Sequence, residues 1–279
     1  MAVAEAKNDK GVDLFAVRSL LFLPGSNPRA IARARQSCAD LVVLDLEDAV
    51  RVEDKASARQ AAVDAVADPW PMPVAIRVNG AGTEWHSLDV DAVSRSKADL
   101  AVMPRSTSAH LIGEAGETLG KPLLAMIETA AGVLAAAEIA GACAGLIAGT
   151  NDLRADLRLP LGATRAPISA SLQMIVLAAR AGGVPAFDGV FNQLDDDEGF
   201  VNEAEDGRSL GFDGKSLIHP NQIAPCHRAF APSEAEIERA KALVEAFRGG
   251  AERFGNEMVE RMHVEAAQRV LARSAKGGR

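Results

Sequence analysis

Acidic side chains follow two short apolar runs of the sequence. Glu128 comes directly after Leu123–Ile127, and Asp152 follows Gly145–Ala148 after a short loop. Two hard oxygen ligands without a nearby cysteine or histidine suit Mg²⁺, which keeps several of its waters. Each carboxylate alone is also typical of a helix N-cap. Because two uncompensated carboxylates in one pocket repel each other, the pair favours a magnesium site.

An arginine, Arg77, interrupts the apolar run Val74–Val78. Arginine is costly to bury unless a fixed anion meets it. A bidentate grip on a substrate carboxylate would supply that anion. An internal salt bridge to Asp45, Glu47 or Asp48 is the alternative, and both hold if those acids also orient the guanidinium.

The positions of the lysines decide between imine and metal chemistry. A Schiff base needs a desolvated lysine on a strand, but the run Gly145–Gly149 has none and Lys121 precedes its strand. Lys215 is expected at a strand end, either as a solvated loop residue or as a group that binds phosphate or a thioester arm. The pattern therefore favours metal-assisted carbon–carbon chemistry.

Short apolar runs that alternate with alanine-rich helical segments must position these side chains. The expected strands are Ser19–Leu23, Leu41–Leu46, Val74–Val78, Leu100–Met103, Leu123–Ile127, Gly145–Ala148, Pro185–Phe187 and Leu210–Phe212. The alternation indicates right-handed βαβ units and a parallel sheet. It predicts an α/β chain that folds as a (β/α)₈ TIM barrel, with the strand ends meeting at one mouth. An open doubly wound sheet is the alternative, but its Gly-x-Gly-x-x-Gly loop is missing.

Helical signals continue after the eighth expected strand. Ser233 and Glu236 form a capping box, Gly249-Gly250 separates that helix from a last one over Met258–Arg273, and the acidic stretch Asp195–Glu198 is expected in a solvated loop. The expected segments are an N-terminal arm (1–17), a barrel (18–224) and a C-terminal helical extension (225–279) that packs on a neighbouring subunit.

Composition excludes several classes of protein. The chain has 279 residues, 48% of them hydrophobic, and a net charge of −8 without a basic patch, so nucleic acid is not an expected partner. No run approaches the roughly 18 apolar residues of a membrane span, and the N-terminus lacks an apolar signal core. We therefore expect a cytoplasmic location, in which three widely spaced cysteines are reduced thiols.

Five segments together carry a family resemblance. They are Arg18–Asn27, Leu44–Val50, Ile76–Asn79, Met126–Thr129 and Gly211–Pro220. In this order they resemble the citrate lyase beta-chain-like family, which includes malyl-, citramalyl- and citryl-thioester lyases of the metal-dependent aldolase superfamily. The resemblance implies a TIM barrel, a homotrimer or a dimer of trimers, and Mg²⁺ as cofactor.

The resemblance also implies roles for particular residues. Glu128 and Asp152 would be the metal ligands, and Arg77 would hold the 2-oxo acid or its enolate. Glu47 and Asp48 would position metal-bound water and Arg77. The thioester arm, from coenzyme A or an acyl-carrier protein, would run near the loop Pro24, Gly25, Ser26 and Asn27.

The sequence departs from the family near its C-terminus. Family members commonly end a segment Met-Ile-Asp-x-Pro, whose Asp reaches a neighbouring subunit's site as acid or base. Here Glu260 stands in place of that Asp, and the proline is missing. The longer side chain moves the carboxylate by about one C–C bond, and a displacement of order 1 Å can cost roughly 10²-fold in rate.

The expected activity is Mg²⁺-dependent cleavage of a 3-hydroxy-3-carboxyacyl thioester to an acyl thioester and a 2-oxo acid such as oxaloacetate. Glu260 of a partner chain is the candidate acid for the enolate. The alternatives are a small-aldehyde aldolase that uses free 2-oxo acids, a thioester hydrolase or malate-synthase-like enzyme, and a weakly active accessory subunit.

Overall fold

The computed structural model describes residues 11–276, which form two compact units divided between Ala229 and Phe230. None of the helices in this part of the chain is long and apolar enough to cross a membrane. Residues 1–10 of the expected N-terminal arm lie outside the described residues.

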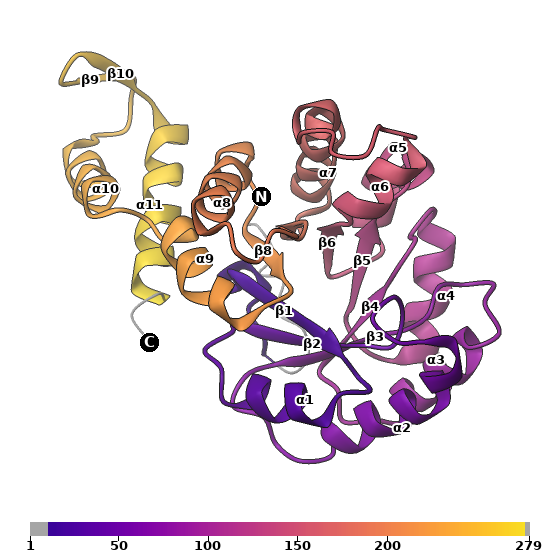
Figure 1. Ribbon diagram of the computed structural model, residues 1–279. Coiled ribbons are helices and arrows are strands. Elements are labelled where there is room, and N and C mark those ends of the chain that lie inside the picture. Colours follow the sequence, from indigo (N-terminus) through magenta and orange to yellow (C-terminus); the bar gives the residue numbers. More distant parts are fainter. Residues whose placement is uncertain (1–10, 277–279) are drawn as a thin grey trace. The chain divides into compact units, whose positions relative to one another are not determined.

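The first unit is a closed barrel of eight parallel strands in sequence order (Figure 1). The strands are β1 (Ser19–Pro24), β2 (Leu41–Asp45), β3 (Val74–Arg77), β4 (Leu100–Met103), β5 (Leu123–Ile127), β6 (Gly145–Ala148), β7 (Ala186–Asp188) and β8 (Gly214–Leu217). β8 pairs with β1 and closes the ring. The expected TIM barrel is confirmed.

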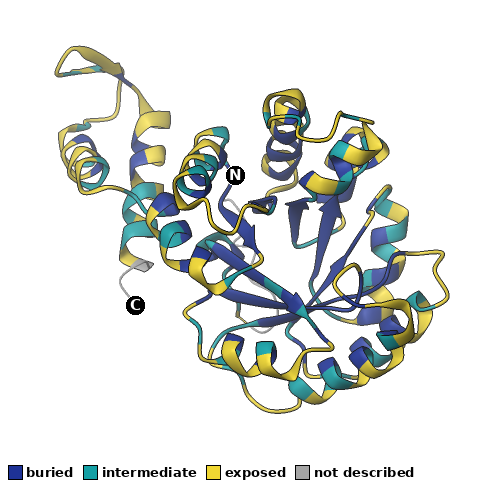
Figure 2. Ribbon diagram, viewed as in Figure 1, coloured by how far each residue is buried: buried dark blue, intermediate teal, exposed yellow. Residues whose placement is uncertain are grey.

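The strands are nearly continuous buried runs, which Figure 2 shows as a dark interior behind helices that are exposed on their outer side. Inward side chains from successive strands fill the barrel, among them Leu20, Val43, Leu124, Ile147 and Phe187. A parallel barrel covered by helices has no solvated strand face, so apolar runs without polar alternation are what it requires.

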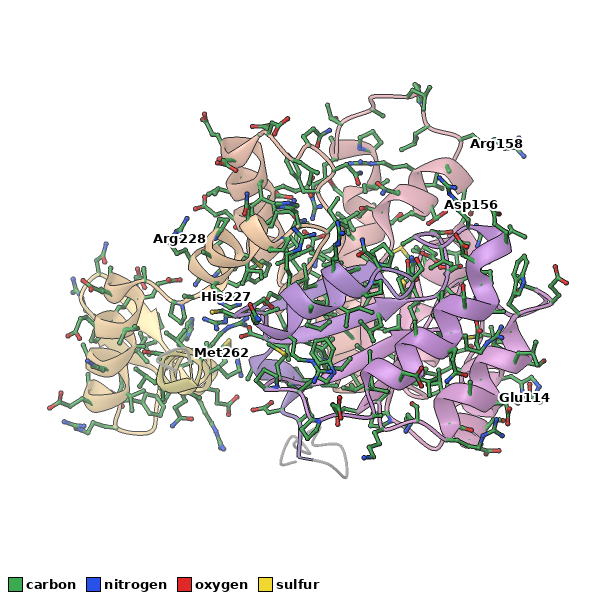
Figure 3. The ribbon with its side chains drawn as sticks, turned by 60° about the horizontal axis from the view of Figure 1, so that its bottom comes forward. Glu114, Asp156, Arg158, His227, Arg228 and Met262 are labelled. Atoms are coloured by element: carbon green, nitrogen blue, oxygen red, sulfur yellow. The ribbon has the colours of Figure 1, made fainter. Side chains whose placement is uncertain are left out.

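The helices of this unit begin at sequence-encoded caps. They are α1 (Pro28–Arg35), α2 (Lys55–Ala65), α3 (His86–Ser94), α4 (Ala109–Leu119), α5 (Ala130–Ala140), α6 (Thr150–Asp156), α7 (Ser169–Gly182), α8 (Asp197–Leu210) and α9 (Ile223–Phe230), with 3₁₀ turns at Leu14–Ala16, Val52–Asp54, Ala166–Ile168 and Pro220–Gln222. Asn27, Ser108 and Thr129 accept backbone N–H bonds at the starts of α1, α4 and α5. Asp156, labelled in Figure 3, also accepts the Ala130 N–H at 2.7 Å, as orphan donors of a first turn require.

The last two strands begin later than predicted, and β7 does so by only one residue. The prediction of a strand at Leu210–Phe212 is wrong, because α8 extends to Leu210. Gly211 ends the helix in the left-handed region at φ 102°, a conformation that glycine adopts at low cost. The strand follows at β8. The acidic stretch is not simply a loop either, because Asp196 caps α8 and two acids occupy the first turn.

The second unit contains α10 (Glu234–Ala246), the hairpin β9 (Glu252–Phe254) and β10 (Glu257–Val259), and α11 (Arg261–Lys276). The capping box of Ser233 and Glu236 is confirmed. Met258 was expected in the last helix but lies in β10, and α11 begins at Arg261. α10 and α11 share a small apolar core that includes Leu243, Val259 and Val264.

Candidate active site at the barrel mouth

A cavity of about 360 Å³ opens where the strands end. Eight of the residues that line it are Phe22, Asp45, Asp48, Arg77, Met126, Glu128, Asp152 and Ser216. Because all eight strands are parallel, polar residues that follow strands far apart in sequence meet at one mouth. We name Asp45, Glu47, Asp48, Arg77, Glu128 and Asp152 the mouth cluster.

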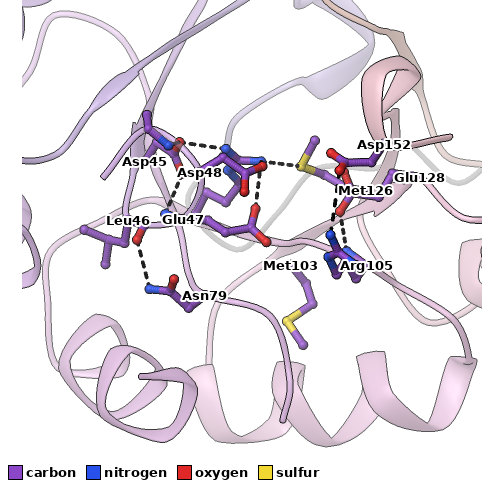
Figure 4. Close-up of polar contacts among 12 residues, drawn as sticks. Asp45, Leu46, Glu47, Asp48, Asn79, Met103, Arg105, Met126, Glu128 and Asp152 are labelled. Atoms are coloured by element: carbon purple, nitrogen blue, oxygen red, sulfur yellow. Dashed lines mark hydrogen bonds and ion pairs between the residues drawn. The ribbon is translucent and has the colours of Figure 1, made fainter. Parts of the chain in front are cut away.

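Arg77 is held by Asp45, the last residue of β2, and by two acids that follow it, Glu47 and Asp48; the three acids are labelled in Figure 4. Its Nε and Nη2 donate to the two oxygens of Asp45 at 2.7 and 2.6 Å, a bidentate geometry typical of strong pairs. Nη1 lies 2.9 Å from Glu47 Oε2 and 3.7 Å from Asp48. Burial opposes the charge, but these acids raise the pKa of Arg77. The internal salt bridge is therefore present, and a grip on substrate by the same guanidinium stays a prediction.

A buried lysine supports the loop that carries these acids. Lys55 Nζ donates to the carbonyls of Leu46 and Glu47 at 2.8 and 2.7 Å and to Asn79 Oδ1 at 2.7 Å. Asn79 in turn donates to Leu46 O and to Asp89. Lys55 is 6% exposed, and burial lowers its pKa although several acids oppose the change. Its three donors fix the backbone under Glu47.

Arg105 joins the two expected metal ligands. Its backbone N–H donates to Glu128 Oε1 at 2.6 Å, and its guanidinium lies 3.7 Å from Asp152 Oδ1, as Figure 4 shows. Arg105 has a positive φ of 48°, a conformation that costs a side-chain-bearing residue about 1 kcal/mol. The backbone after β4 is thus strained where it holds Glu128.

Crowding of carboxylates shifts their protonation. Burial raises the pKa of Glu47 to about 8, with Asp48, Glu128 and Asp45 adding to the effect and Arg77 opposing it. Burial also raises the pKa of Glu128 to about 7, and Asp152 contributes. The pKa of Asp152 rises too, through burial and then the charge of Asp48. An excess of acids in one cavity favours a cation there.

The donor set fits Mg²⁺ better than a metal that takes a full protein shell. Glu128 Oε2 is buried and has no hydrogen-bond partner within the described chain. Over residues 11–276, no three His, Cys, Asp or Glu side chains gather closely enough to hold an ion. Two carboxylates with open positions are what Mg²⁺ uses when waters and substrate complete its shell. Glu128 and Asp152 are the residues that would hold it.

The loop after β1 is only partly in the cavity. Of Pro24, Gly25, Ser26 and Asn27, the described cavity wall includes Pro24 alone. Asn27 caps α1, and a Cβ at Gly25 would lie 3.0 Å from the carbonyl of Asp45, so two of the four have structural reasons for their identity. Contact of this loop with a thioester arm stays a prediction.

Lys215 does not lie at a strand end, where it was predicted. It lies inside β8 and is fully buried, and Nζ donates to Asp188, Gly189 O and Glu203 at 3.0, 2.7 and 2.8 Å. It is neither a solvated loop residue nor free to bind phosphate or a thioester arm, because the strand begins later than predicted. We name Arg165, Asp188, Glu203, Asp206 and Lys215 the wall cluster.

Glu260 belongs to the second unit. It is exposed, and its backbone N–H donates to His263 Nδ1 at 2.9 Å at the start of α11. Its role in a neighbouring subunit's site stays a prediction.

Three residues of this site were not singled out from the sequence. Arg105 was visible as a polar strand end, but its bond to Glu128 comes from the backbone, which no side-chain pattern reveals. Lys55 could have been suspected from a lysine in the first turn after an acidic loop. Ser216 carried no signal, because a serine in an apolar strand is common.

The chain is similar to known proteins over most of its length. The family model HpcH/HpaI aldolase/citrate lyase matches residues 18–220. A (3S)-malyl-CoA thioesterase of Cereibacter sphaeroides is 41% identical over 92% of this chain and 94% of that protein. Citrate lyase subunit beta of Haemophilus influenzae is 35% identical over 93% and 97%.

Solved structures agree. Protein CitE from Mycobacterium tuberculosis, in complex with magnesium, acetoacetate and coenzyme A, has a TM-score of 0.84 and 33% identity and covers 94% of this chain and 100% of that one. A citrate lyase beta subunit from the same organism, complexed with oxaloacetate and magnesium, has a TM-score of 0.72 and 34% identity over 79% and 100%. The resemblance seen in the sequence is confirmed, and the chain belongs to the HpcH/HpaI aldolase/citrate lyase family.

Proposed function

We propose that the chain is a Mg²⁺-dependent carbon–carbon lyase that cleaves a 3-hydroxy-3-carboxyacyl thioester of coenzyme A to an acyl thioester and a 2-oxo acid. One observation carries the proposal: Glu128, with an unpartnered buried oxygen, and Asp152 line one cavity at the ends of neighbouring strands. Relatives whose structures contain magnesium with acetoacetate and coenzyme A, or with oxaloacetate, support it.

Bound between Glu128 and Asp152, Mg²⁺ would act as a Lewis acid toward the oxygen that becomes the keto group. Arg77 offsets the negative charge of the 2-oxo acid carboxylate, while Asp45 fixes the plane of its guanidinium. Burial raises the pKa of Glu47 to about 8 in the metal-free cavity, so its carboxyl can hold or release a proton near neutral pH. It can therefore give a proton to, or take one from, a group beside Arg77.

Protonation of the acyl enolate needs a further acid, and we assign it to Glu260 of a neighbouring subunit in a trimer or hexamer. Mixing a Glu128→Gln chain with a Glu260→Gln chain tests this assignment. If two chains build each site, the mixture regains activity that neither variant has alone. Two inactive variants that stay inactive after co-refolding, while wild type regains full activity in the same procedure, would contradict it.

Hydrolysis of the thioester is a second candidate, because the 41%-identical relatives are malyl-CoA thioesterases. The same metal and cavity would serve if water attacks the thioester carbonyl instead of the C–C bond breaking. Glu260, which stands in place of the family's aspartate, favours hydrolysis over C–C cleavage. A displaced acid slows protonation of the enolate, which only the cleavage reaction forms.

One assay separates the two activities. The chain is incubated with (3S)-malyl-CoA, with Mg²⁺ or with EDTA, and free thiol and glyoxylate are both measured. The lyase releases glyoxylate and acetyl-CoA without free thiol, whereas the hydrolase releases malate and one free thiol per turnover. Citramalyl- and citryl-CoA extend the test to pyruvate and oxaloacetate. Turnover in EDTA, or of none of the three thioesters, would contradict the proposed function.

A further inference from the structure

Ser216 is a buried hydroxyl in the wall of the cavity. It lies in β8 with 2% of its surface exposed, and it lines the same cavity as Arg77, Glu128 and Asp152. Its Oγ has no hydrogen-bond partner in the described part of the chain. Buried polar groups are nearly always paired, so an exception calls for a physical reason.

The strand places this hydroxyl on the inner face of the barrel. Neighbouring residues of a strand point to opposite faces, and the side chain of Lys215 points outward to Asp188 and Glu203. Ser216 therefore points inward, and in the sheet its partner is Leu20 of the barrel core. β8 lies three strands round the closed ring from β5, which Glu128 follows.

Several side chains that line the cavity with Ser216 are apolar or already paired within the protein. Phe22 and Met126 line the cavity as apolar side chains, and Arg77 is occupied by Asp45 and Glu47. A ligand anchored at Glu128 and Asp152 through a metal would reach toward β8 with its far end. The wall also includes the polar residues Asn151 and Asn192, whose side chains are hydrogen-bonded to each other. A buried donor without a partner in this wall is suited to an oxygen acceptor.

We propose that Ser216 Oγ donates a hydrogen bond to a carbonyl or carboxylate oxygen of the bound ligand, at the end opposite the metal-chelating group, and so selects for ligands that carry that oxygen. The inference rests on the proposed function and adds a specificity residue to it. The oxygen has two possible sources, the second carboxylate of a dicarboxylic 2-oxo acid or the carbonyl of the acyl thioester.

The test compares Ser216→Ala with wild type by calorimetric titration in Mg²⁺ with three ligands. Oxaloacetate carries a second carboxylate, acetyl-CoA carries the thioester carbonyl, and pyruvate carries neither. The variant is expected to lose about tenfold in affinity for oxaloacetate or for acetyl-CoA and to bind pyruvate as wild type does. The ligand that loses affinity identifies the source of the oxygen.

Stability supplies an independent readout. The hydroxyl has no partner to lose, so Ser216→Ala should unfold at the same temperature as wild type or higher. Ser19→Ala is the matched control, because Ser19 is equally buried but its Oγ accepts from Asp40 N–H and contacts His227, at 2.9 and 2.8 Å. That variant should unfold at a lower temperature and keep every ligand affinity. Ser216→Cys keeps the size without the strong donor and should bind as the alanine variant does.

Three results would overturn the inference. They are unchanged affinity of Ser216→Ala for all three ligands, an equal loss for pyruvate, and a drop in unfolding temperature as large as that of Ser19→Ala. A wild-type chain that binds none of the ligands in Mg²⁺ would instead contradict the proposed function, and the inference with it. The two failures are therefore distinguishable.

Discussion

Two buried charge clusters in the same barrel differ in how completely they are paired. In the wall cluster, Lys215 and Arg165 share Asp188 between them, with contacts of 3.0 and 2.9 Å. Burial opposes ionisation of Asp188, yet the two cations keep its pKa below the usual range. The mouth cluster contains five acids and one cation, Arg77, with Arg105 3.7 Å from Asp152. Burial there raises the pKa values of Glu47 and Glu128 instead.

The difference is the one we expect between a charge cluster that stabilises the fold and one that binds a ligand. Buried ions are tolerated when each meets its partner, and they shift their pKa when they do not. In the mouth cluster, Glu128 Oε2 is buried without a hydrogen-bond partner, whereas among the described residues no buried atom of the wall cluster lacks one. Stability should therefore depend most on the wall cluster, and binding on the mouth cluster.

The largest expected effect on stability comes from Lys215→Met. Removing the cation leaves Asp188 and Glu203 buried with less compensation, which costs about 3–5 kcal/mol, measurable by denaturant unfolding. Lys241→Met on α10 is the control, because its pair with Glu238 is exposed and should change stability by less than about 0.5 kcal/mol. Equal effects of the two variants would remove the distinction between the clusters.

Glu47→Gln should give a pH-dependent gain. The wild-type carboxyl has a pKa raised from 4.5 to about 8, so its ionisation favours the unfolded chain as pH rises between those values. The variant does not ionise. The difference in unfolding free energy, variant minus wild type, should therefore increase by on the order of 4 kcal/mol from pH 4 to pH 9 in EDTA. A difference that stays flat with pH would show that Arg77 keeps Glu47 ionised.

Lys55→Met tests the support under the mouth cluster. Glu47 O and Asn79 Oδ1 lose the hydrogen bond from Lys55, and Leu46 O keeps only the one from Asn79. We expect a cost of about 1–3 kcal/mol. Displacement of Glu47 should lower kcat by roughly 10-fold or more, while KM changes less. The substrate for this measurement is the thioester that the assay above shows to be turned over. Lys97→Met, which loses one exposed bond to Ala67 O, should leave both unchanged. Loss of stability without loss of kcat would restrict Lys55 to folding.

The smallest effect is expected at Arg105. Glycine tolerates its φ of 48°, so Arg105→Gly should be more stable than Arg105→Ala by about 1 kcal/mol. Both variants keep the backbone N–H that reaches Glu128 and lose the guanidinium beside Asp152. Unfolding curves of the pair measure the strain, and equal stabilities would show that the backbone after β4 relaxes.

More of the fold than of the candidate site could be predicted from the sequence. Uninterrupted apolar runs placed β4, β5 and β6 at their observed bounds, because buried parallel strands have no alternative pattern. The apolar residues of Leu210–Phe212 were wrongly predicted as a strand, because they belong to the end of α8 and the turn after it. Since Lys215 was then placed at a strand end, its burial in the wall cluster was missed.

The acidic residues of the mouth cluster could be predicted from the sequence, but their hydrogen-bond partners could not. The spacing of Glu128 and Asp152 after their strands was enough to bring them to one cavity. The bond from the Arg105 backbone and the missing partner of Ser216 depend on atomic positions, and no residue pattern encodes them.

Titration of the metal-free chain with Mg²⁺ decides whether Glu128 and Asp152 share one ion. We expect one ion per wild-type chain, loss of binding in both Glu128→Gln and Asp152→Asn, and unchanged binding in Glu114→Gln, whose carboxylate is exposed on α4. Wild-type affinity in either of the first two variants would contradict a shared ion.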